Sequence, residues 1–226
     1  MAEIILALDL PGQSEALKLL DRAPEVRWVK VGPILMTREG PELIRELVRR
    51  GLRVFLDLKW HDIPNTVVGA VEAARELGVS LATLHALGGA DMMRAAAAAA
   101  GNQLSLVAVT VLTSHDAASY GTALGRDEVN VMEEVGRQAG NAIGAGLQGV
   151  VCSAREAALV RARIGKDSWI VVPGIRRAGD SAGDQIRTAT PAEAVSAGAT
   201  HLVVGRPILQ ATEPSAVFRE MSDAAR

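Results

Sequence analysis

Short runs of apolar and β-branched residues recur along the whole chain and alternate with segments of helical periodicity. The runs that we expect to be strands are 4–8, 28–31, 53–58, 81–85, 104–109, 149–151, 169–172 and 201–204. Several of the helix-like segments between them end at a glycine, a common helix stop. Because a strand, a helix and a second strand in succession join parallel strands, these eight units predict an α/β fold that closes as a (β/α)8 TIM barrel.

An open doubly wound sheet is the main alternative to a barrel. Such sheets often carry a Gly-x-Gly-x-x-Gly turn after the first strand, whereas the first turn here reads DLPGQSEA. No linker, repeat or block of charge divides the chain, and 226 residues can bury a sizeable core. We therefore expect residues 1–226 to form a single barrel domain.

Composition excludes several classes of partner. The net charge is -2 with Lys and Arg spread through the chain, so no basic field is available to hold a nucleic acid. The apolar run in MAEIILALDL is too short for a signal peptide or a membrane span. The single cysteine, Cys152, has no disulfide partner and is expected to be a buried apolar residue. Without a Cys/His cluster for zinc, these features predict a metal-free protein of the reducing cytoplasm.

Three charged residues lie close together at the end of the third predicted strand. In the stretch DLKWHDIPNT, residues 57–66, these are Asp57, Lys59 and Asp62. Side chains alternate along a strand, so Phe55, Asp57 and Lys59 should point into the barrel. A solvated strand end, where the charges neutralise one another, is the alternative for this motif taken alone.

Inward charges are also predicted at the ends of the first two strands. The same alternation places Asp9 and Lys30 on the inward faces of those strands. Each residue alone is better explained as a member of a structural ion pair. Together, however, three adjacent strands would place charged side chains at the same end of the barrel. Burying ammonium and carboxylate groups is costly unless each is paired, so their convergence predicts a functional cluster.

The connections after the strands also carry signals. Asn65 is expected to cap the helix that Pro64 helps to start. Two segments, 113–128 and 176–190, read as long loops at the end of the barrel where such enzymes hold their active sites. Within the second, residues 177–184 are small, polar and rich in glycine, which suits a lid that closes over a ligand.

Several stretches of the chain resemble the motifs of a known protein family. DLKWHDIPNT is similar to the signature of the orotidine 5'-monophosphate decarboxylase family: Asp, any, Lys, two of any, Asp, Ile, Pro, any, Thr. Further similar motifs follow in the family's order: LALD, VKVG, HALGG, VLTS, PGIR, GDQ and VVGRPI. The chain departs from common members at Trp60 and at Val172, which bears on packing more than on activity.

The resemblance implies decarboxylation of orotidine 5'-monophosphate to uridine 5'-monophosphate, the last step of de novo pyrimidine nucleotide synthesis, without metal or organic cofactor. It implies that Lys59 stabilises and protonates the carbanion formed on the ring, as a cation placed beside developing negative charge can. Asp57 would lie beside the departing carboxylate. Lys30 would orient Asp57 and bind the ribose, and Asp9 would bind a ribose hydroxyl.

The resemblance also implies contacts to the rest of the nucleotide. Thr113, or Ser114 beside it, would contact the pyrimidine. The residues that it implies for the phosphate are Arg176, Gln185, Gly205 and Arg206. A planar guanidinium donates parallel hydrogen bonds to phosphate, and glycine lets the backbone approach an anion closely.

Homodimer formation is a further implication. Asp62, as part of the catalytic set, and Thr66 match positions that reach into the neighbouring subunit's site in this family. The histidines receive no role: His85 is expected to be a hydrogen-bonded structural residue.

Two rival functions remain open from the motifs. Magnesium-dependent relatives on the same barrel, of the keto-gulonate phosphate decarboxylase or hexulose phosphate synthase type, also carry Asp-x-Lys-x-x-Asp. A catalytically silent barrel that senses uridine monophosphate is the other. The additional IPNT, LTS and PGIR motifs favour the orotidylate enzyme over the first, and the intact Asp57 and Lys59 favour it over the second.

Overall fold

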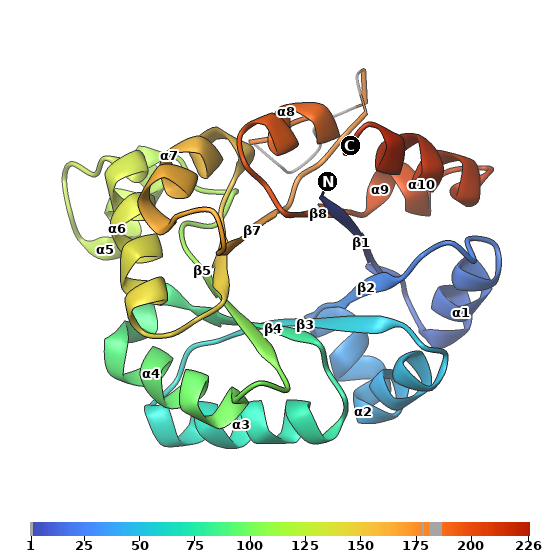
Figure 1. The fold of residues 1–226 in the computed structure, drawn as a ribbon, viewed down its shortest axis with the longest axis horizontal. Helices are drawn as coiled ribbons and strands as arrows, with labels where there is room; N and C mark the ends of the chain where they lie inside the picture. The colour runs from blue at the N-terminus through green and yellow to red at the C-terminus, as the bar shows by residue number, and fades with distance from the viewer. Residues whose placement is uncertain (1, 178, 181–186) are drawn as a thin grey trace.

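Eight parallel strands form a closed barrel in the computed structural model, which describes residues 2–177, 179–180 and 187–226 (Figure 1). The strands are β1 (Glu3–Ala7), β2 (Trp28–Val31), β3 (Arg53–Trp60), β4 (Leu81–His85), β5 (Ser105–Val109), β6 (Gly149–Val151), β7 (Trp169–Val172) and β8 (His201–Val204). Each strand pairs with the next in the sequence, and β8 closes the ring on β1. The predicted fold class is therefore confirmed. The third strand continues two residues further than expected, to Trp60.

Helices form the outer ring around these strands (Figure 1). They are α1 (Gln13–Asp21), α2 (Pro33–Arg49), α3 (Pro64–Glu76), the short 3-10 turn η1 (Ala86–Gly88), α4 (Gly89–Ala100), α5 (Ala117–Leu124), α6 (Val131–Gly144), α7 (Ala154–Ile164), α8 (Pro191–Ser196), α9 (Arg206–Leu209) and α10 (Pro214–Asp223). None of the helices in the described part of the chain has the length and apolar character needed to cross a membrane.

Two expectations about the connections are wrong. Asn65 does not cap α3: Pro64 is the first helical residue and Ile63 takes the cap position without a side-chain bond. The proline ring fixes its own φ for the helix and disfavours helical geometry in the residue before it, so the helix begins at Pro64. The segment 113–128 is not wholly a loop, because it contains α5, whose Asp116 accepts a 2.8 Å hydrogen bond from the Ser119 amide.

Two apolar cores follow from the alternation of side chains along the strands. Outward-facing residues pack against the helices in the larger core. Inward-facing residues fill the barrel itself: Ile5, Ala7, Trp28, Phe55, Leu81, Val107, Val171 and Val203. Lys30 follows Trp28 on the inward face of β2, and Asp57 follows Phe55 on that of β3. The filled interior therefore forms a floor beneath the charged residues.

Aromatic residues pack together at the beginning of β2, β7 and β8, the N-terminal end of the barrel. The ring of His201 lies 4.4 Å from that of Trp169 and 5.8 Å from that of Trp28. His201 is 5% exposed, and burial, reinforced by the positive charge of Arg53, lowers the pKa of the imidazole to about 4. A neutral imidazole is thus part of the packing at this end.

The buried imidazole should make the fold sensitive to acid. Its pKa falls from 6.5 in the unfolded chain to about 4 in the folded chain. The corresponding stability is fully present above the unfolded value and is lost as the pH falls toward the folded value. Between roughly pH 7 and pH 5, we expect the free energy of unfolding to drop by about 2 kcal/mol more in the parent protein than in His201→Gln. Urea titrations at both pH values measure this difference, and equal losses in the two proteins would contradict it.

Candidate active site

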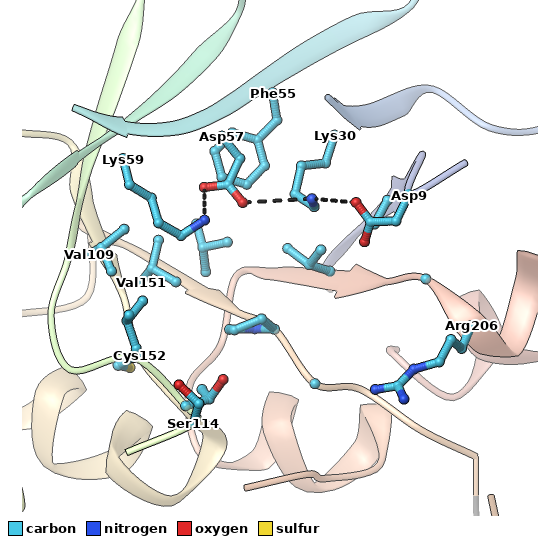
Figure 2. Close-up of a pocket in the computed structure, with 18 of the residues that line it drawn as sticks. Asp9, Lys30, Phe55, Asp57, Lys59, Val109, Ser114, Val151, Cys152 and Arg206 are labelled. Atoms are coloured by element: carbon cyan, nitrogen blue, oxygen red, sulfur yellow. Dashed lines mark hydrogen bonds and ion pairs between the residues drawn. The ribbon is translucent and has the colours of Figure 1, made fainter. Parts of the chain in front are cut away.

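A cavity of about 620 Å³ opens at the C-terminal ends of the strands. Its lining comes from every strand except β4 and from the segments that follow β1, β5, β6, β7 and β8. Apolar side chains such as Phe55, Val109 and Val151 line it together with four charged groups near β1 to β3 (Figure 2). A concave site with apolar walls and a few convergent polar groups is typical of a small-molecule site.

The four predicted charges form a continuous row across one side of this cavity (Figure 2). The Lys30 ammonium lies 3.0 Å from Asp9 Oδ1 and 3.7 Å from Asp57 Oδ2. The Lys59 ammonium lies 2.9 Å from Asp57 Oδ1. Negative and positive charges therefore alternate in the order Asp9, Lys30, Asp57, Lys59, as the alternation of side chains on adjacent strands predicted.

Burial divides this row into an inner pair and two outer groups. The side chains of Lys30 and Asp57 are 11% and 13% exposed, whereas those of Lys59 and Asp9 are 35% and 55% exposed. The inner charges are thus held by their partners, and the outer ones have surface left for a ligand. Glycine at position 32 preserves this packing, because a Cβ there would lie 3.2 Å from Lys30 Nζ.

Lys59 has an unusual backbone conformation. Its φ is 52°, which is the left-handed region that a non-glycine residue adopts at a cost of roughly 1–2 kcal/mol. The register between β3 and β4 shifts between Leu56 and Trp60, as in a β-bulge. Strain of this kind is concentrated at functional sites, where the surrounding structure holds it in place.

Thr83 on β4 was not predicted as a site residue, yet its side chain contacts Asp57 and Lys59, two residues of the β3 bulge. Its hydroxyl donates to Asp57 Oδ1 at 3.0 Å and accepts the Lys59 amide at 2.9 Å. Thr83 is fully buried, and it shares the inward face of β4 with Leu81. A polar residue on the inward face of a strand adjacent to β3 was the sequence signal that could have identified it.

The predicted phosphate and pyrimidine residues lie elsewhere around the same cavity. Thr113 and Ser114 follow β5, and Arg176, Gly205 and Arg206 line the part formed by β7 and β8. Figure 2 shows Arg206 well separated from Lys59, with the cavity between them. Gln185 and most of the predicted lid, residues 177–184, fall outside the described residues. The base of that loop is closed by pairing of Ile175 with Ala189.

The two non-catalytic expectations have different outcomes. Cys152 is buried, as expected, at the edge of the cavity, and desolvation raises the pKa of its thiol, which disfavours the reactive thiolate. His85 stacks on His61 with ring centroids 5.5 Å apart, but its Nδ1 is buried with no hydrogen-bond partner among the described residues. The expectation of a hydrogen-bonded imidazole is therefore wrong for that nitrogen, and burial lowers the pKa of His85.

Asp62 and Thr66 do not join the cavity of their own chain. Both are exposed, as is Ile63 between them, whose surface is 67% accessible. The structure thus brings together Asp9, Lys30, Asp57 and Lys59, and leaves Asp62 facing outward. Within the residues that the structure describes, no group of three or more His, Cys, Asp or Glu side chains could hold a metal ion.

Comparison with known proteins gives consistent similarities over the whole chain. Residues 2–221 match the family model described as orotidine 5'-phosphate decarboxylase / HUMPS family. A protein of Alkalilimnicola ehrlichii named orotidine 5'-phosphate decarboxylase is 52% identical, covering 97% of this chain and 94% of the relative. One of the same name from Halorhodospira halophila is 50% identical, covering 94% and 91%. The crystal structure of orotidine 5'-phosphate decarboxylase from Lactobacillus acidophilus superposes with a TM-score of 0.89 at 34% identity, covering 100% of both chains.

Proposed function

This chain belongs to the orotidine 5'-phosphate decarboxylase / HUMPS family, and on that premise we propose that it decarboxylates orotidine 5'-monophosphate to uridine 5'-monophosphate in the cavity described above. Its relatives in Alkalilimnicola ehrlichii and Halorhodospira halophila carry the name of this activity. The observation that carries the proposal is the row of alternating charges that ends at Lys59. It places an ammonium group, held from one side by Asp57, at the surface of a cavity that both apolar and polar side chains line.

Lys59 supplies what the reaction needs. Loss of carbon dioxide leaves an electron pair on an sp² ring carbon, where conjugation cannot delocalise it. A cation already in place beside that carbon stabilises the developing charge without reorganisation, and an ammonium can then deliver a proton to the same carbon. The 2.9 Å contact with Asp57 Oδ1 orients the ammonium, and the side chain is still 35% exposed toward a ligand.

Asp57 holds Lys59 in place, and Lys30 in turn holds Asp57. Asp57 is held by Lys30 at one oxygen and by Lys59 at the other. Lys30 in turn bonds Asp9, whose 55% exposed carboxylate can accept a hydrogen bond from a ribose hydroxyl. Repulsion between Asp57 and the substrate carboxylate would be a ground-state effect. The mechanism proposed here relies instead on stabilisation of the carbanion by Lys59.

The phosphate is proposed to bind at the other side of the cavity. Arg206, Arg176 and the Gly205 backbone lie there, after the seventh and eighth strands, where barrels commonly hold phosphate. We assign Thr113, with Ser114 beside it, to the pyrimidine on the sequence resemblance, and both residues line the cavity. Gln185 is retained as a phosphate ligand on the sequence resemblance alone.

We further propose a homodimer in which Asp62 and Thr66 complete the neighbour's site. Both side chains are exposed next to Ile63, a large apolar residue at the surface, and neither lines the cavity of its own chain. The assembly rests on the sequence resemblance, and the exposure of Asp62 and Thr66 leaves both side chains accessible to a second copy. Sedimentation that shows only monomer at assay concentrations would contradict this assembly.

An ultraviolet assay tests the activity directly. Purified protein mixed with orotidine 5'-monophosphate should release carbon dioxide and form uridine 5'-monophosphate at an unchanged rate when a chelator such as EDTA is present. A rate that collapses with the chelator and returns with magnesium would favour the metal-dependent relatives. Nucleotide binding without turnover would favour the silent sensor.

The nucleoside orotidine is an informative second substrate in that assay. It keeps the reacting ring but lacks the phosphate, so it cannot use Arg206 and Arg176. Binding energy from a remote group can lower the barrier at the reacting centre, so for orotidine we expect kcat to fall as well as KM to rise. Equal kcat/KM for the two substrates would remove the arginines from their proposed role.

A further inference from the structure

We propose that Thr83 is a positioning residue for the reaction, acting through Asp57 and Lys59 without touching the substrate. The inference rests on the proposed decarboxylation and adds a residue that neither the motif nor the cavity lining contains. Thr83 lies on β4, the one strand of the barrel whose described residues do not line the cavity. Thr83 therefore acts on the charged row without lining the cavity.

The hydroxyl of Thr83 accepts one hydrogen bond and donates another. The Lys59 amide can only donate, so at 2.9 Å Thr83 Oγ1 must accept from it. The single hydroxyl hydrogen is then available for Asp57 Oδ1, which lies 3.0 Å away. Thr83 is 0% exposed, so water does not compete for either bond. One buried atom consequently links the backbone of Lys59 to the carboxylate that orients its ammonium.

The bulge explains why this link is needed. Because the register of β3 and β4 shifts between Leu56 and Trp60, the intervening residues do not continue the regular ladder. Lys59 has turned to a φ of 52°, and its amide bonds a side chain of β4. Thr83 thereby takes the place of a ladder carbonyl and holds the left-handed conformation.

Lys59 is consequently fixed at both ends. Thr83 holds its amide, and Asp57 Oδ1 holds its ammonium at 2.9 Å. Asp57 Oδ1 accepts from Thr83 as well, so the rotation of the carboxylate is also restricted. Removal of the hydroxyl should allow the backbone to relax and the carboxylate to turn. A displacement of about 1 Å at a reacting group can lower the rate by roughly 100-fold.

The test replaces the hydroxyl by a methyl group of similar size. We expect Thr83→Val to lower kcat for orotidine 5'-monophosphate by about 10- to 100-fold, with affinity for uridine 5'-monophosphate within about threefold of the parent. Thr83→Ser, which restores the hydroxyl, should recover most of kcat. Thr200→Val is the matched control: the Thr200 hydroxyl accepts the Ile170 amide at 3.0 Å and donates to the Ile170 carbonyl at 3.2 Å, at the N-terminal end of the barrel, away from the cavity. This control should keep kcat within about twofold.

The outcomes separate the positioning role from general damage and from the proposed function. If Thr83→Val turns over like the parent, or loses no more than Thr200→Val, the role of Thr83 is overturned. If Thr83→Val does not fold, Thr83→Ala against Thr83→Ser gives the same comparison. If the parent itself fails to turn over the substrate, the proposed function fails. Crystal structures then decide for Thr83: an unchanged Lys59 φ and Nζ to Asp57 Oδ1 distance in the variant would refute the link, and a relaxed φ would support it.

Discussion

Replacement of Lys59 by alanine is expected to abolish carbon dioxide release while leaving product binding measurable. The variant loses the cation beside the reacting carbon and the proton donor together, so kcat should fall on the order of 10⁴-fold or more. The fold should tolerate the change, because Asp57 keeps Lys30 and Thr83 as partners. Single-turnover assays with orotidine 5'-monophosphate, alongside calorimetric titration with uridine 5'-monophosphate, measure the two effects separately.

Lys166→Ala provides the matched control for that experiment. Lys166 is exposed and precedes β7, so it lies at the end of the barrel away from the cavity. Its removal deletes the same charge and should leave kcat within about twofold of the parent. If Lys59→Ala retained kcat within tenfold, Lys59 could not be the group that stabilises and protonates the ring.

The second large effect concerns the ion pair between Arg187 and Glu156, in which the side chains are 7% and 3% exposed. Arg187 also donates to the Leu112 carbonyl at 2.8 Å, and Glu156 accepts the Ser153 amide at 2.8 Å at the start of α7. The Arg187–Glu156 pair therefore links the three segments that follow β5, β6 and β7 at the C-terminal end of the barrel. Because the carboxylate is buried, removal of its partner leaves an uncompensated charge.

We expect Arg187→Met to lower the free energy of unfolding by about 3–5 kcal/mol. The double variant Arg187→Met with Glu156→Gln should recover part of that loss, because the charge left behind is removed too. Arg45→Met is the control, since the pair of Arg45 with Glu42 is 56% and 75% exposed and should contribute less than about 1 kcal/mol. Urea unfolding of the four proteins measures these differences. Equal destabilisation by Arg187→Met and Arg45→Met would contradict the argument.

The barrel could be predicted from the sequence because its determinants are local. Runs such as 28–31 and 169–172 are short, apolar and rich in β-branched residues, and they form strands with those bounds. Alternation along such strands also placed Lys30 and Asp57 in one interior. Both predictions need only the period of a strand and the parallel order that strand–helix repeats impose.

Other features could not be predicted because they depend on partners distant in sequence. The bulge at Lys59 depends on the Thr83 hydroxyl, 24 residues away. The Arg187 contact with the Leu112 carbonyl spans 75 residues. The helix α5 is a different case: it lacks a clear apolar face, but its capping box at Asp116 is a local signal from which its start could have been predicted. Nothing in the composition of these segments specifies the tertiary contact that each one makes.

The alternating row has a consequence for how an anionic nucleotide would first meet the protein. Two ammonium and two carboxylate groups sum to zero, so from a distance this wall exerts little pull on a phosphate. On the proposed arrangement, the guanidinium groups of Arg206 and Arg176 would capture the nucleotide by its phosphate. The base would swing toward the neutralised wall afterwards, and the alternation of charge there would matter only at contact range. Capture of the nucleotide and the chemical step would then depend on residues at opposite sides of one cavity.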